Sequence, residues 1–307
     1  MLVAVVMDAV IGWPALLFAA IGHPVTWLGA AISALDRALN RDTDPAMRRR
    51  LSGVAVVVVV AGGTALVAVL LVWFMPQGWV GSVLTGILAW PFVAMRSLHD
   101  HVAAVERPLI HGDIAGARGA VAMIVGRDPD RLDAPGVVRA ALESLAENTS
   151  DGVVAPLFWG VLLGLPGIAA YKAINTMDSM IGHKSPRFCD FGWAAARLDD
   201  LVNLAPARLT GVLFAAVAHY PSAALRVMWR DAGKHRSPNA GWPEAAMAGG
   251  LGIRLSGPRA YGAEISAEPW VNDGAPDPDV IDMAHGLHLF RIAMAGLAAV
   301  LAIAALI

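Results

Sequence analysis

Residues 53–95 read GVAVVVVVAGGTALVAVLLVWFMPQGWVGSVLTGILAWPFVAM and contain no Asp, Glu, Lys, Arg or His. About 20 consecutive apolar residues are enough for a helix to cross the hydrocarbon core of a bilayer. The stretch is long enough for two such helices, and Pro76 and Gly78 mark a turn between them. It therefore predicts two membrane spans, over about residues 54–75 and 79–95.

Four further apolar segments lie outside this pair, and each is predicted to span the membrane or to be embedded in it. They cover residues 2–21, 152–171, 209–225 and 292–307. The segment 152–171 contains Pro156, Pro166 and four glycines, which is typical of an interrupted or re-entrant element that surrounding protein buries. Period-2 strand patterns are nearly absent. The sequence predicts an all-α integral membrane protein, a polytopic helical bundle forming a single domain over residues 1–307, with polar loops and helices on its cytoplasmic side.

The composition agrees with a membrane protein. Of the 307 residues, 57% are hydrophobic and 16% are charged, whereas soluble domains carry about 25% charged residues. Disorder is excluded because unfolded chains combine low hydrophobicity with high charge. The formal net charge of −2 and the lack of a basic tail exclude a nucleic-acid-binding class. A single cysteine, Cys189, permits no intramolecular disulfide.

The arginines predict the orientation. Five of them follow the first apolar segment, and the turn at 75–78 carries none. The positive-inside rule then places the 22–52 loop and the mainly helical 96–151 region in the cytoplasm. The five are Arg37, Arg41, Arg48, Arg49 and Arg50.

Three polar clusters adjoin the apolar segments, where polar groups are costly and usually functional. They cover residues 143–152, 171–186 and 197–208. Each contains an Asn and an Asp three residues apart, a spacing that puts two oxygen ligands on one face of a helix. The pairs are Asn148/Asp151, Asn175/Asp178 and Asp200/Asn203.

These clusters also contain cations. Mg²⁺ takes a few carboxylate oxygens and bridges substrate phosphates, and cationic side chains hold phosphate oxygens during phosphoryl transfer. The residue types therefore indicate Mg²⁺-dependent chemistry on a phosphorylated substrate, and the plainer alternative is ion pairing at membrane ends. No P-loop, dinucleotide-binding or zinc-protease motif is present in the sequence. The cations are Lys172, Lys184, Arg197 and Arg208.

The same stretches resemble the CobD/CbiB family of cobalamin biosynthesis proteins, the adenosylcobinamide-phosphate synthases, in order along nearly the whole chain. One departure is at Gly12-Trp13-Pro14, where an acidic residue is expected between Gly and Pro. The strings that carry the resemblance are His23-Pro24-Val25, Leu98-His99-Asp100-His101, Ile124-Val125-Gly126-Arg127-Asp128, residues 143–152, residues 175–183, Asp199-Asp200-Leu201-Val202-Asn203 with Pro206-Ala207-Arg208, and Ser237-Pro238-Asn239-Ala240-Gly241.

The resemblance implies an ATP-dependent amide ligase in the bacterial inner membrane, with its active site facing the cytoplasm. Such an enzyme joins the free propionate carboxylate of adenosylcobyric acid to (R)-1-amino-2-propanol or its O-phosphate, through an acyl phosphate, and gives adenosylcobinamide or its phosphate. Mg²⁺ is the implied cofactor and ATP the co-substrate. A homo-oligomer, or a complex with other enzymes of the pathway, stays open.

Residue roles follow as a hypothesis from this resemblance. Acidic residues hold Mg²⁺ and one of them accepts the proton of the amine, whereas cations and amides hold phosphates and orient the substrates. The catalytic set is Glu147, Asp151, Asp178 and Asp200, and the metal set is Asp151, Asp178, Asp199 and Asp200. The binding set is Asn148, Lys172, Asn175, Ser179, His183, Lys184, Arg197, Asn203 and Arg208.

Two other classes stay open on the residues alone. A Mg²⁺-dependent membrane transferase acting on a prenyl diphosphate or a CDP-alcohol also places aspartates at the membrane face, but the repeated D-x-x-x-D spacing of such enzymes is missing. A corrinoid transporter without catalysis fits interrupted helices, but it does not require acid–amide pairs beside cations.

Overall fold

A computed structural model describes residues 1–126, 129–261, 264–266 and 268–306. Its helices fall into two compact units. Unit 1 consists of Met1–Ala94 and Ala155–Asn203, and unit 2 of Met95–Val154 and Leu204–Ile307. Each unit thus combines two separate stretches of the chain.

Five helical stretches are long and apolar enough to cross a membrane, namely Ala15–Leu39, Ala46–Trp73, Trp79–Ile110, Ala134–Ile181 and Val280–Ala304. The predicted helical membrane fold is confirmed. Residues 193–217 meet the same criteria only as two helices taken together across a bend. The first of these two helices carries Arg197, Asp199 and Asp200, so we count only the five stretches without such a bend as spans.

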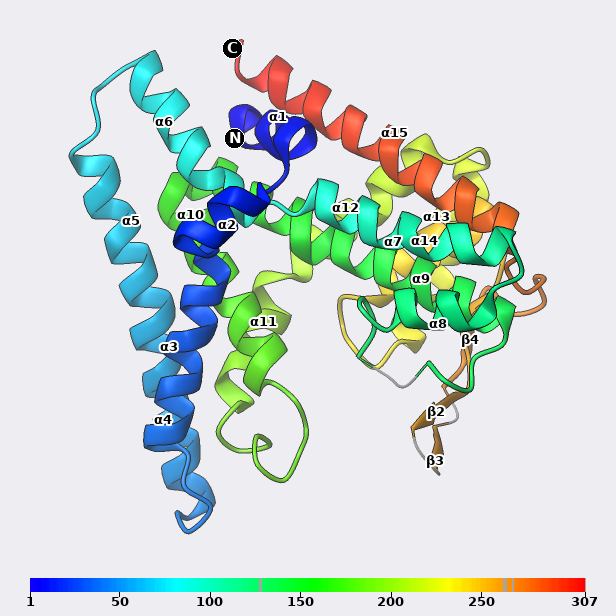
Figure 1. The fold of residues 1–307 in the computed structure, drawn as a ribbon, viewed down its shortest axis with the longest axis horizontal. Helices are drawn as coiled ribbons and strands as arrows, with labels where there is room; N and C mark the ends of the chain where they lie inside the picture. The colour runs from blue at the N-terminus through cyan, green and yellow to red at the C-terminus, as the bar shows by residue number, and fades with distance from the viewer. Residues whose placement is uncertain (127–128, 262–263, 267, 307) are drawn as a thin grey trace. The chain divides into compact units, whose positions relative to one another are not determined.

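Unit 1 contains the hairpin predicted from residues 53–95. Its two arms are α5 and α6, which run in opposite directions in Figure 1, and the long helix α10 packs against both. The helices of unit 1 are α1 (Leu2–Ile11), α2 (Ala15–Ile21), α3 (Pro24–Leu39), α4 (Ala46–Val57), a π-helical turn η1 (Val58–Gly62), α5 (Gly63–Trp73), α6 (Trp79–Ala89), a 3-10 turn η2 (Trp90–Phe92), α10 (Ala155–Ile181) and α11 (Trp193–Val202).

Some predicted segment boundaries differ from the structure. Residues 2–21 do not form one helix, because Gly12 has a φ of 62° and Pro14 follows; the first long apolar stretch is Ala15–Leu39 instead. The predicted loop 22–52 is mostly helical, since only residues 40–45 separate α3 from α4. The predicted segment 209–225 is divided between two helices, because Pro221 begins a new one.

The predicted interruption of 152–171 is present. Residues 150–154 form a π-helical turn, and α10 bends at Gly164, where φ is 67° and ψ is −151°. Only glycine adopts this backbone conformation readily. Pro166 follows two residues later and removes a backbone donor.

An apolar core in unit 1 holds α10 and α11 against α3 and α4. Ile32, Met177 and Phe191 are fully buried at its centre, together with Val56 and Ala195. Burying a side chain of this size contributes about 1.5–3 kcal/mol. The core thus fixes the ends of α10 and α11, on which the candidate site is built.

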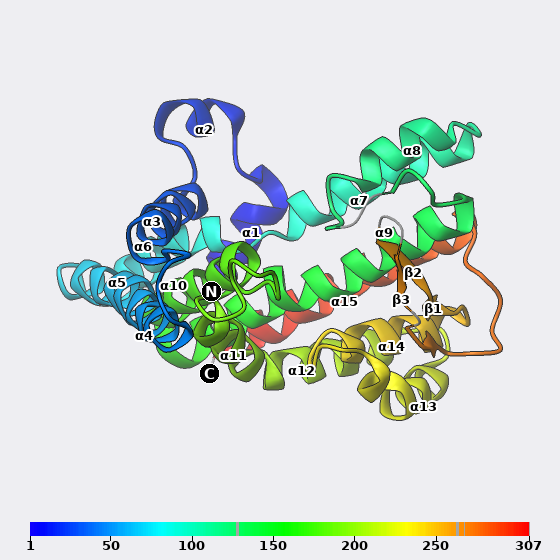
Figure 2. The same ribbon diagram turned by 90° about the horizontal axis from the view of Figure 1, so that it is seen from below.

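Unit 2 contains the remaining helices and the four short strands of the described residues. Helices α13 and α14 lie side by side, as do α7 and α8 (Figure 2). The elements are α7 (Met95–Ile110), α8 (Ile114–Val121), α9 (Ala134–Thr149), η3 (Ser150–Val154), α12 (Leu204–Val217), α13 (Pro221–Asp231), η4 (Ala232–Lys234), α14 (Gly241–Leu251), β1 (Leu255–Ser256) paired with β4 (Trp270–Val271), β2 (Arg259–Tyr261) paired with β3 (Glu264–Ser266), and α15 (Val280–Ala304).

A buried carboxylate joins α13 to the strand region of unit 2. Asp231 is fully buried, and its oxygens accept hydrogen bonds from Arg230 (2.7 and 2.9 Å) and from the backbone N–H of Asn272 (2.7 Å). Lys234 Nζ lies 2.8 Å from the same carboxylate. Burial alone raises the pKa of Asp231, but Arg230, Lys234 and the Asn272 amide outweigh burial and hold this pKa well below its usual range. Asp231 is therefore a neutralised structural anion.

Candidate active site

The candidate site in unit 1 lies where α10 ends beside α11. Asp178 lies in the last turn of α10, and Asp199 and Asp200 are neighbours on α11; these three residues are called the acidic cluster below. Gly192 permits the close approach of the two helices, because a Cβ there would lie 1.6 Å from the Ile181 carbonyl oxygen. The site therefore depends on a glycine immediately before α11.

Asp199 is the buried member of the acidic cluster, with 8% of its surface exposed. Its Oδ2 accepts a hydrogen bond from Asn203 Nδ2 at 2.9 Å, and its Oδ1 accepts one from Asn175 Nδ2 at 3.4 Å. Two of the three predicted Asn residues thus converge on one carboxylate. The spacing argument paired Asn203 with Asp200, but Asn203 contacts Asp199, one helical turn away at i,i+4.

The carboxylates of the acidic cluster lie close enough to affect each other's pKa values. Burial, followed by the nearby charge of Asp178, raises the pKa of Asp199 to about 7. Burial also raises the pKa of Asp200, although Arg197 and Lys184 oppose that shift. Like charges held together disfavour ionisation until a cation neutralises them. The cluster is therefore suited to binding a cation.

Cationic and neutral donors border the acidic cluster. Arg197 Nη1 lies 3.5 Å from Asp200 Oδ2, and both side chains are substantially exposed. Lys184 interacts electrostatically with Asp200, and His183 with Asp178. These predicted phosphate-binding residues therefore lie beside the predicted metal ligands, in one unit.

Two other predicted binding residues lie on α10. The Ser179 hydroxyl donates to the backbone oxygen of Asn175 at 2.9 Å, one turn earlier. Lys172 lies on the same helix, and its charge acts on His23 at the start of α3. Both residues belong to unit 1, and the binding roles proposed for them stay predictions.

The remaining predicted residues belong to unit 2. Glu147 and Asp151 are four residues apart, at the end of α9 and in the π-helical turn η3, a local structure frequent at functional sites. Asn148 Nδ2 donates to the backbone and side-chain oxygens of Ser144 at 2.9 and 3.1 Å. The roles proposed for these three residues stay predictions.

Arg208 packs within unit 2. It donates to the Leu204 carbonyl at 2.7 Å, and its guanidinium lies 4.4 Å from the centroid of the Trp242 ring. This geometry supports packing of α12 against α14, and the predicted phosphate-binding role stays untested. Arg127 and Asp128, which belong to a quoted family string, lie outside the described residues.

The acidic cluster can be tested for its fit to Mg²⁺. Among the described residues, no group of three or more His, Cys, Asp or Glu side chains is arranged to hold a metal by itself. Mg²⁺ seldom requires one, since it binds through one or two carboxylates and takes its other ligands from water and phosphates. Because the cluster supplies carboxylate oxygens without an enclosing set of ligands, it fits a Mg²⁺–phosphate complex better than a protein-enclosed metal.

Tyr171 is a site residue to which the sequence analysis assigned no role. Its side chain is buried, and its hydroxyl donates to Asn203 Oδ1 at 2.9 Å. This bond turns the Asn203 amide nitrogen toward Asp199, because the amide oxygen is occupied. The sequence spacing could have indicated this residue, because Tyr171 precedes Asn175 by four residues and Asp178 by seven, which places all three on one face of a helix.

A second hydrogen bond joins α10 to the end of α11. Trp159 Nε1, on the first half of α10, donates to the backbone oxygen of Val202 at 3.1 Å. Val202 is the last residue of α11 and precedes Asn203. The bend at Gly164 lies between Trp159 and Tyr171, so both halves of α10 contact the end of α11.

The chain was compared with known proteins. The family model described as CobD/Cbib protein matches residues 1–290. The Cobalamin biosynthesis protein CobD of Rhodobacter capsulatus is 60% identical over 307 residues, which is 100% of this chain and 97% of the relative. No solved structure matches the chain.

More distant relatives carry the same name. The Cobalamin biosynthesis protein CobD of Rhizobium meliloti is 50% identical over 280 residues, 89% of this chain and 86% of the relative. That of Brucella suis is 48% identical over 295 residues, 94% of this chain and 90% of the relative. The family match covers nearly the whole chain and agrees with the membrane fold. This protein therefore belongs to the CobD/CbiB family.

Proposed function

We propose that this protein is the ATP-dependent amide ligase of cobalamin biosynthesis that joins adenosylcobyric acid to (R)-1-amino-2-propanol or its O-phosphate. The names of its relatives support the pathway. The acidic cluster supports the proposed reaction, because a buried Asp199 with a raised pKa lies beside Asp178 and near exposed cations. This arrangement suits the binding of a divalent cation together with phosphates.

The reaction needs ATP because a carboxylate is a poor acyl electrophile. In the proposed first step, a propionate oxygen attacks the γ-phosphorus of ATP, so that an acyl phosphate forms and ADP leaves. In the second step the amine attacks the acyl carbon, inorganic phosphate leaves and the nitrogen loses a proton. The product is an amide, adenosylcobinamide or its phosphate.

The residues of unit 1 receive the following roles in this proposal. Asp178, Asp199 and Asp200 would hold Mg²⁺, which when bound neutralises charge on the transferring phosphoryl group. Lys184 and Arg197 hold phosphate oxygens by their charges. Asn175 and Asn203, through their amide N–H groups, keep the Asp199 carboxylate in one orientation.

The residues of unit 2 complete the proposal. Glu147 and Asp151 remain candidates for the base that accepts the amine proton, or for further metal ligands. Asn148, which is held by Ser144, is a candidate for orienting the substrate. We further propose that the site faces the cytoplasm, where ATP is available, in agreement with the arginine distribution.

The test is a reconstituted reaction. Detergent-solubilised protein is incubated with adenosylcobyric acid, ATP and Mg²⁺, with aminopropanol or its O-phosphate in parallel, and the corrinoid mass and the nucleotide product are followed together. We expect the corrinoid to gain one amine minus water, with release of ADP, and EDTA to stop the reaction. Failure to form any corrinoid product with either amine, in folded protein, would contradict the proposal and favour the transferase or transporter class.

A further inference from the structure

The segment that joins α10 to α11 carries two of the residues that border the acidic cluster. It covers residues 182–192, contains His183 and Lys184, and is called the α10–α11 loop below. Its two ends meet, because a Cβ at Gly192 would lie 1.6 Å from the Ile181 carbonyl oxygen. The side chains of His183 and Lys184 are exposed. An exposed loop of this kind keeps one conformation only where other elements hold its backbone.

Two buried side chains outside the loop hold its backbone. They are Arg49 on α4 and Asn40 immediately after α3, which are 9% and 3% exposed, and they are called the loop clamp below. Arg49 Nε donates to Asn40 Oδ1 at 2.9 Å, and Arg49 Nη2 donates to the backbone oxygen of Arg187. Asn40 Nδ2 donates to the same backbone oxygen at 3.2 Å. One carbonyl of the loop thus receives hydrogen bonds from both members of the clamp.

Further ion pairs tie the loop to α3 and α4. Asp36 Oδ1 accepts a hydrogen bond from Asn40 Nδ2 at 2.8 Å, and Asp36 Oδ2 accepts one from the Arg187 guanidinium at 2.8 Å. Arg50 Nε donates to Asp190 Oδ1 at 2.8 Å. The loop is therefore held through both its backbone and its side chains, at residues 187 and 190.

The three consecutive arginines at 48–50 have different surroundings. Arg48 pairs with Asp44 one turn earlier, and 67% of its side chain is exposed. Arg50 is half-exposed, whereas Arg49 is buried. The positive-inside rule explains cytoplasmic charge at all three positions, but it requires no buried guanidinium. Burial of a charge is costly unless acceptors surround it, and here the α10–α11 loop supplies an acceptor to Arg49.

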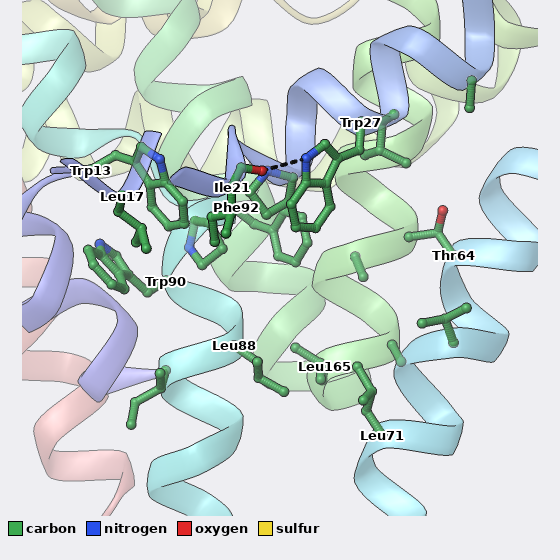
Figure 3. A pocket seen from close by; sticks show the side chains of 18 residues that line it. Trp13, Leu17, Ile21, Trp27, Thr64, Leu71, Leu88, Trp90, Phe92 and Leu165 are labelled. Atoms are coloured by element: carbon green, nitrogen blue, oxygen red, sulfur yellow. Dashed lines mark hydrogen bonds between the residues drawn. The ribbon is translucent and has the colours of Figure 1, made fainter. Parts of the chain in front are cut away.

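The loop clamp lies at the far end of α3 from an apolar groove among the membrane helices of unit 1. On α3 the groove is lined by residues between Pro24 and Ala31; among them Trp27 donates from Nε1 to the Ile21 carbonyl at 2.9 Å (Figure 3). Asn40 follows the last residue of the same helix, about 14 Å farther along the helix axis than Ala31. The clamp therefore lies on the arginine-bearing side of unit 1, which we expect to face the cytoplasm, where ATP is available.

From these contacts we propose that Asn40 and Arg49 are positioning residues. By holding the backbone oxygen of Arg187, they keep the α10–α11 loop in the conformation that places Lys184 near Asp200, where it can hold a phosphate of ATP. This inference rests on the phosphate-binding role proposed for Lys184. A loop that is already ordered loses less conformational entropy when the nucleotide binds. The clamp therefore acts mainly on the affinity for Mg²⁺–ATP and less on the chemical steps.

The consecutive arginines provide the variants and their control. Arg49→Gln removes the guanidinium of the clamp. Arg50→Gln removes an exposed tie to Asp190 and leaves the buried residues in place. Arg48→Gln changes a neighbouring arginine of the same helix, whose ion-pair partner Asp44 lies outside the loop, and is the matched control. Thermal unfolding of each variant verifies that the protein is folded.

The chain's single cysteine allows loop mobility to be measured without a further substitution. Cys189 lies in the α10–α11 loop and is exposed, so a nitroxide spin label on its thiol reports that mobility by electron paramagnetic resonance. Equilibrium dialysis with radiolabelled β,γ-methylene-ATP and Mg²⁺ gives the nucleotide affinity of unlabelled protein without turnover. The rate of amide formation at several ATP concentrations gives KM and kcat separately.

We expect Arg49→Gln to make the label mobile. Its Kd for the analogue and its KM for ATP should both rise about ten-fold, the effect of losing one charge-assisted hydrogen bond, whereas kcat should stay within about two-fold of the wild type. Arg50→Gln should raise Kd about two-fold, because an exposed ion pair contributes less. Arg48→Gln should change none of these quantities.

The outcomes separate the clamp from the ligase reaction. Equal label mobility in Arg49→Gln and Arg48→Gln would overturn the clamp, and so would a mobile loop with unchanged nucleotide affinity. A wild type that binds the analogue but forms no amide would contradict the ligase, and the ten-fold shift in Kd would still support the clamp. A wild type that binds no analogue would overturn the positioning role. If Arg49→Gln does not fold, Arg50→Gln supplies the same two readouts, and an unchanged label and Kd there would count against the clamp.

Discussion

Asp199 in unit 1 and Asp231 in unit 2 are both buried aspartates, but their surroundings are opposite. Asp231 is held by Arg230, Lys234 and a backbone N–H, which together lower its pKa. Asp199 accepts hydrogen bonds from the amides of Asn175 and Asn203 and lies near another aspartate, Asp178; burial, followed by the charge of Asp178, raises its pKa to about 7. Each environment favours a different protonation state of the same side chain.

This difference indicates which carboxylate is available for chemistry. A buried anion that is fully paired stabilises the fold and offers no free charge to a ligand. A carboxylate held by neutral amides beside like charge is destabilised until a cation arrives, and such sites are frequently functional. We therefore propose that Asp231 serves the fold and Asp199 the reaction, and each substitution below tests that division.

The largest expected effect is on turnover. Asp199→Asn keeps the shape of the side chain and removes its charge, so the proposed cation site is lost. We expect the amide-forming rate to fall by about 10²–10³-fold, the effect of removing one electrostatic group from an active site. The rate is measured as corrinoid product per folded protein, and an unchanged rate would show that Asp199 has no role in the reaction.

The corresponding substitution at Asp231 should lower the free energy of unfolding. Asp231→Asn leaves Arg230 and Lys234 without their anion, and breaking a buried pair costs about 3–5 kcal/mol. Because both cations are partly exposed, we expect a loss of about 2–3 kcal/mol in the free energy of unfolding. Denaturation in detergent measures this loss. Turnover of the folded fraction should match the wild type, and a selective loss of turnover would place Asp231 in the reaction.

The two aspartates should give opposite pH dependences of stability. Asp231, with a lowered pKa, contributes stability that is complete above the pKa of the unfolded chain, near 4, and that is lost as the pH falls below it. Asp199, with a pKa raised to about 7, reduces stability as the pH rises from about 4 to 7, because only the unfolded state has lost its proton.

This contrast is measured with EDTA present, as the unfolding free energy of each Asn variant relative to the wild type at several pH values. The difference for Asp231→Asn should shrink toward acid pH. For Asp199→Asn, the gain in stability over the wild type should grow by at most about 1.4 kcal/mol per pH unit up to pH 7. Parallel curves for the two variants would remove the distinction between them.

The smallest expected effect concerns Tyr171. Tyr171→Phe removes the hydrogen bond that orients the Asn203 amide toward Asp199, and such a bond contributes about 1 kcal/mol. We expect the Mg²⁺ concentration for half-maximal rate to rise about five-fold, and the free energy of unfolding to fall by about 1–3 kcal/mol because the buried Asn203 Oδ1 loses its donor. Tyr220→Phe, at an exposed position before α13, is the matched control and should change neither quantity.

The membrane hairpin could be predicted from sequence because span length and lack of charge are properties of a continuous run, as in residues 53–95. The first span begins later in the structure than the predicted segment 2–21, because the backbone at Gly12, with a φ of 62°, ends α1. The interruption of α10 was predicted from its Gly and Pro content, but nothing in the sequence distinguishes Gly164, where the helix bends, from the other glycines of the segment.

The candidate site was only partly predictable, for a similar reason. The polar strings identified Asp178, Asp199 and Asp200, because charge next to apolar segments is conspicuous in a sequence. The bond from Asn175 to Asp199 joins residues 24 positions apart, and local spacing contains no information about such a contact. The role of Tyr171 was missed because its hydroxyl acts through Asn203 rather than directly on the acids.

The oxygen atoms of the substrate report whether an acyl phosphate forms and whether Asp199 is needed to form it. Adenosylcobyric acid labelled with oxygen-18 in its free carboxylate is turned over with ATP, Mg²⁺ and the amine by the wild type, Asp199→Asn and Asp231→Asn. We predict that the wild type and Asp231→Asn transfer one labelled oxygen to inorganic phosphate, and that Asp199→Asn does so far more slowly. Label in AMP would contradict the acyl phosphate, and wild-type rates in Asp199→Asn would contradict the assignment of the acidic cluster as the reactive centre.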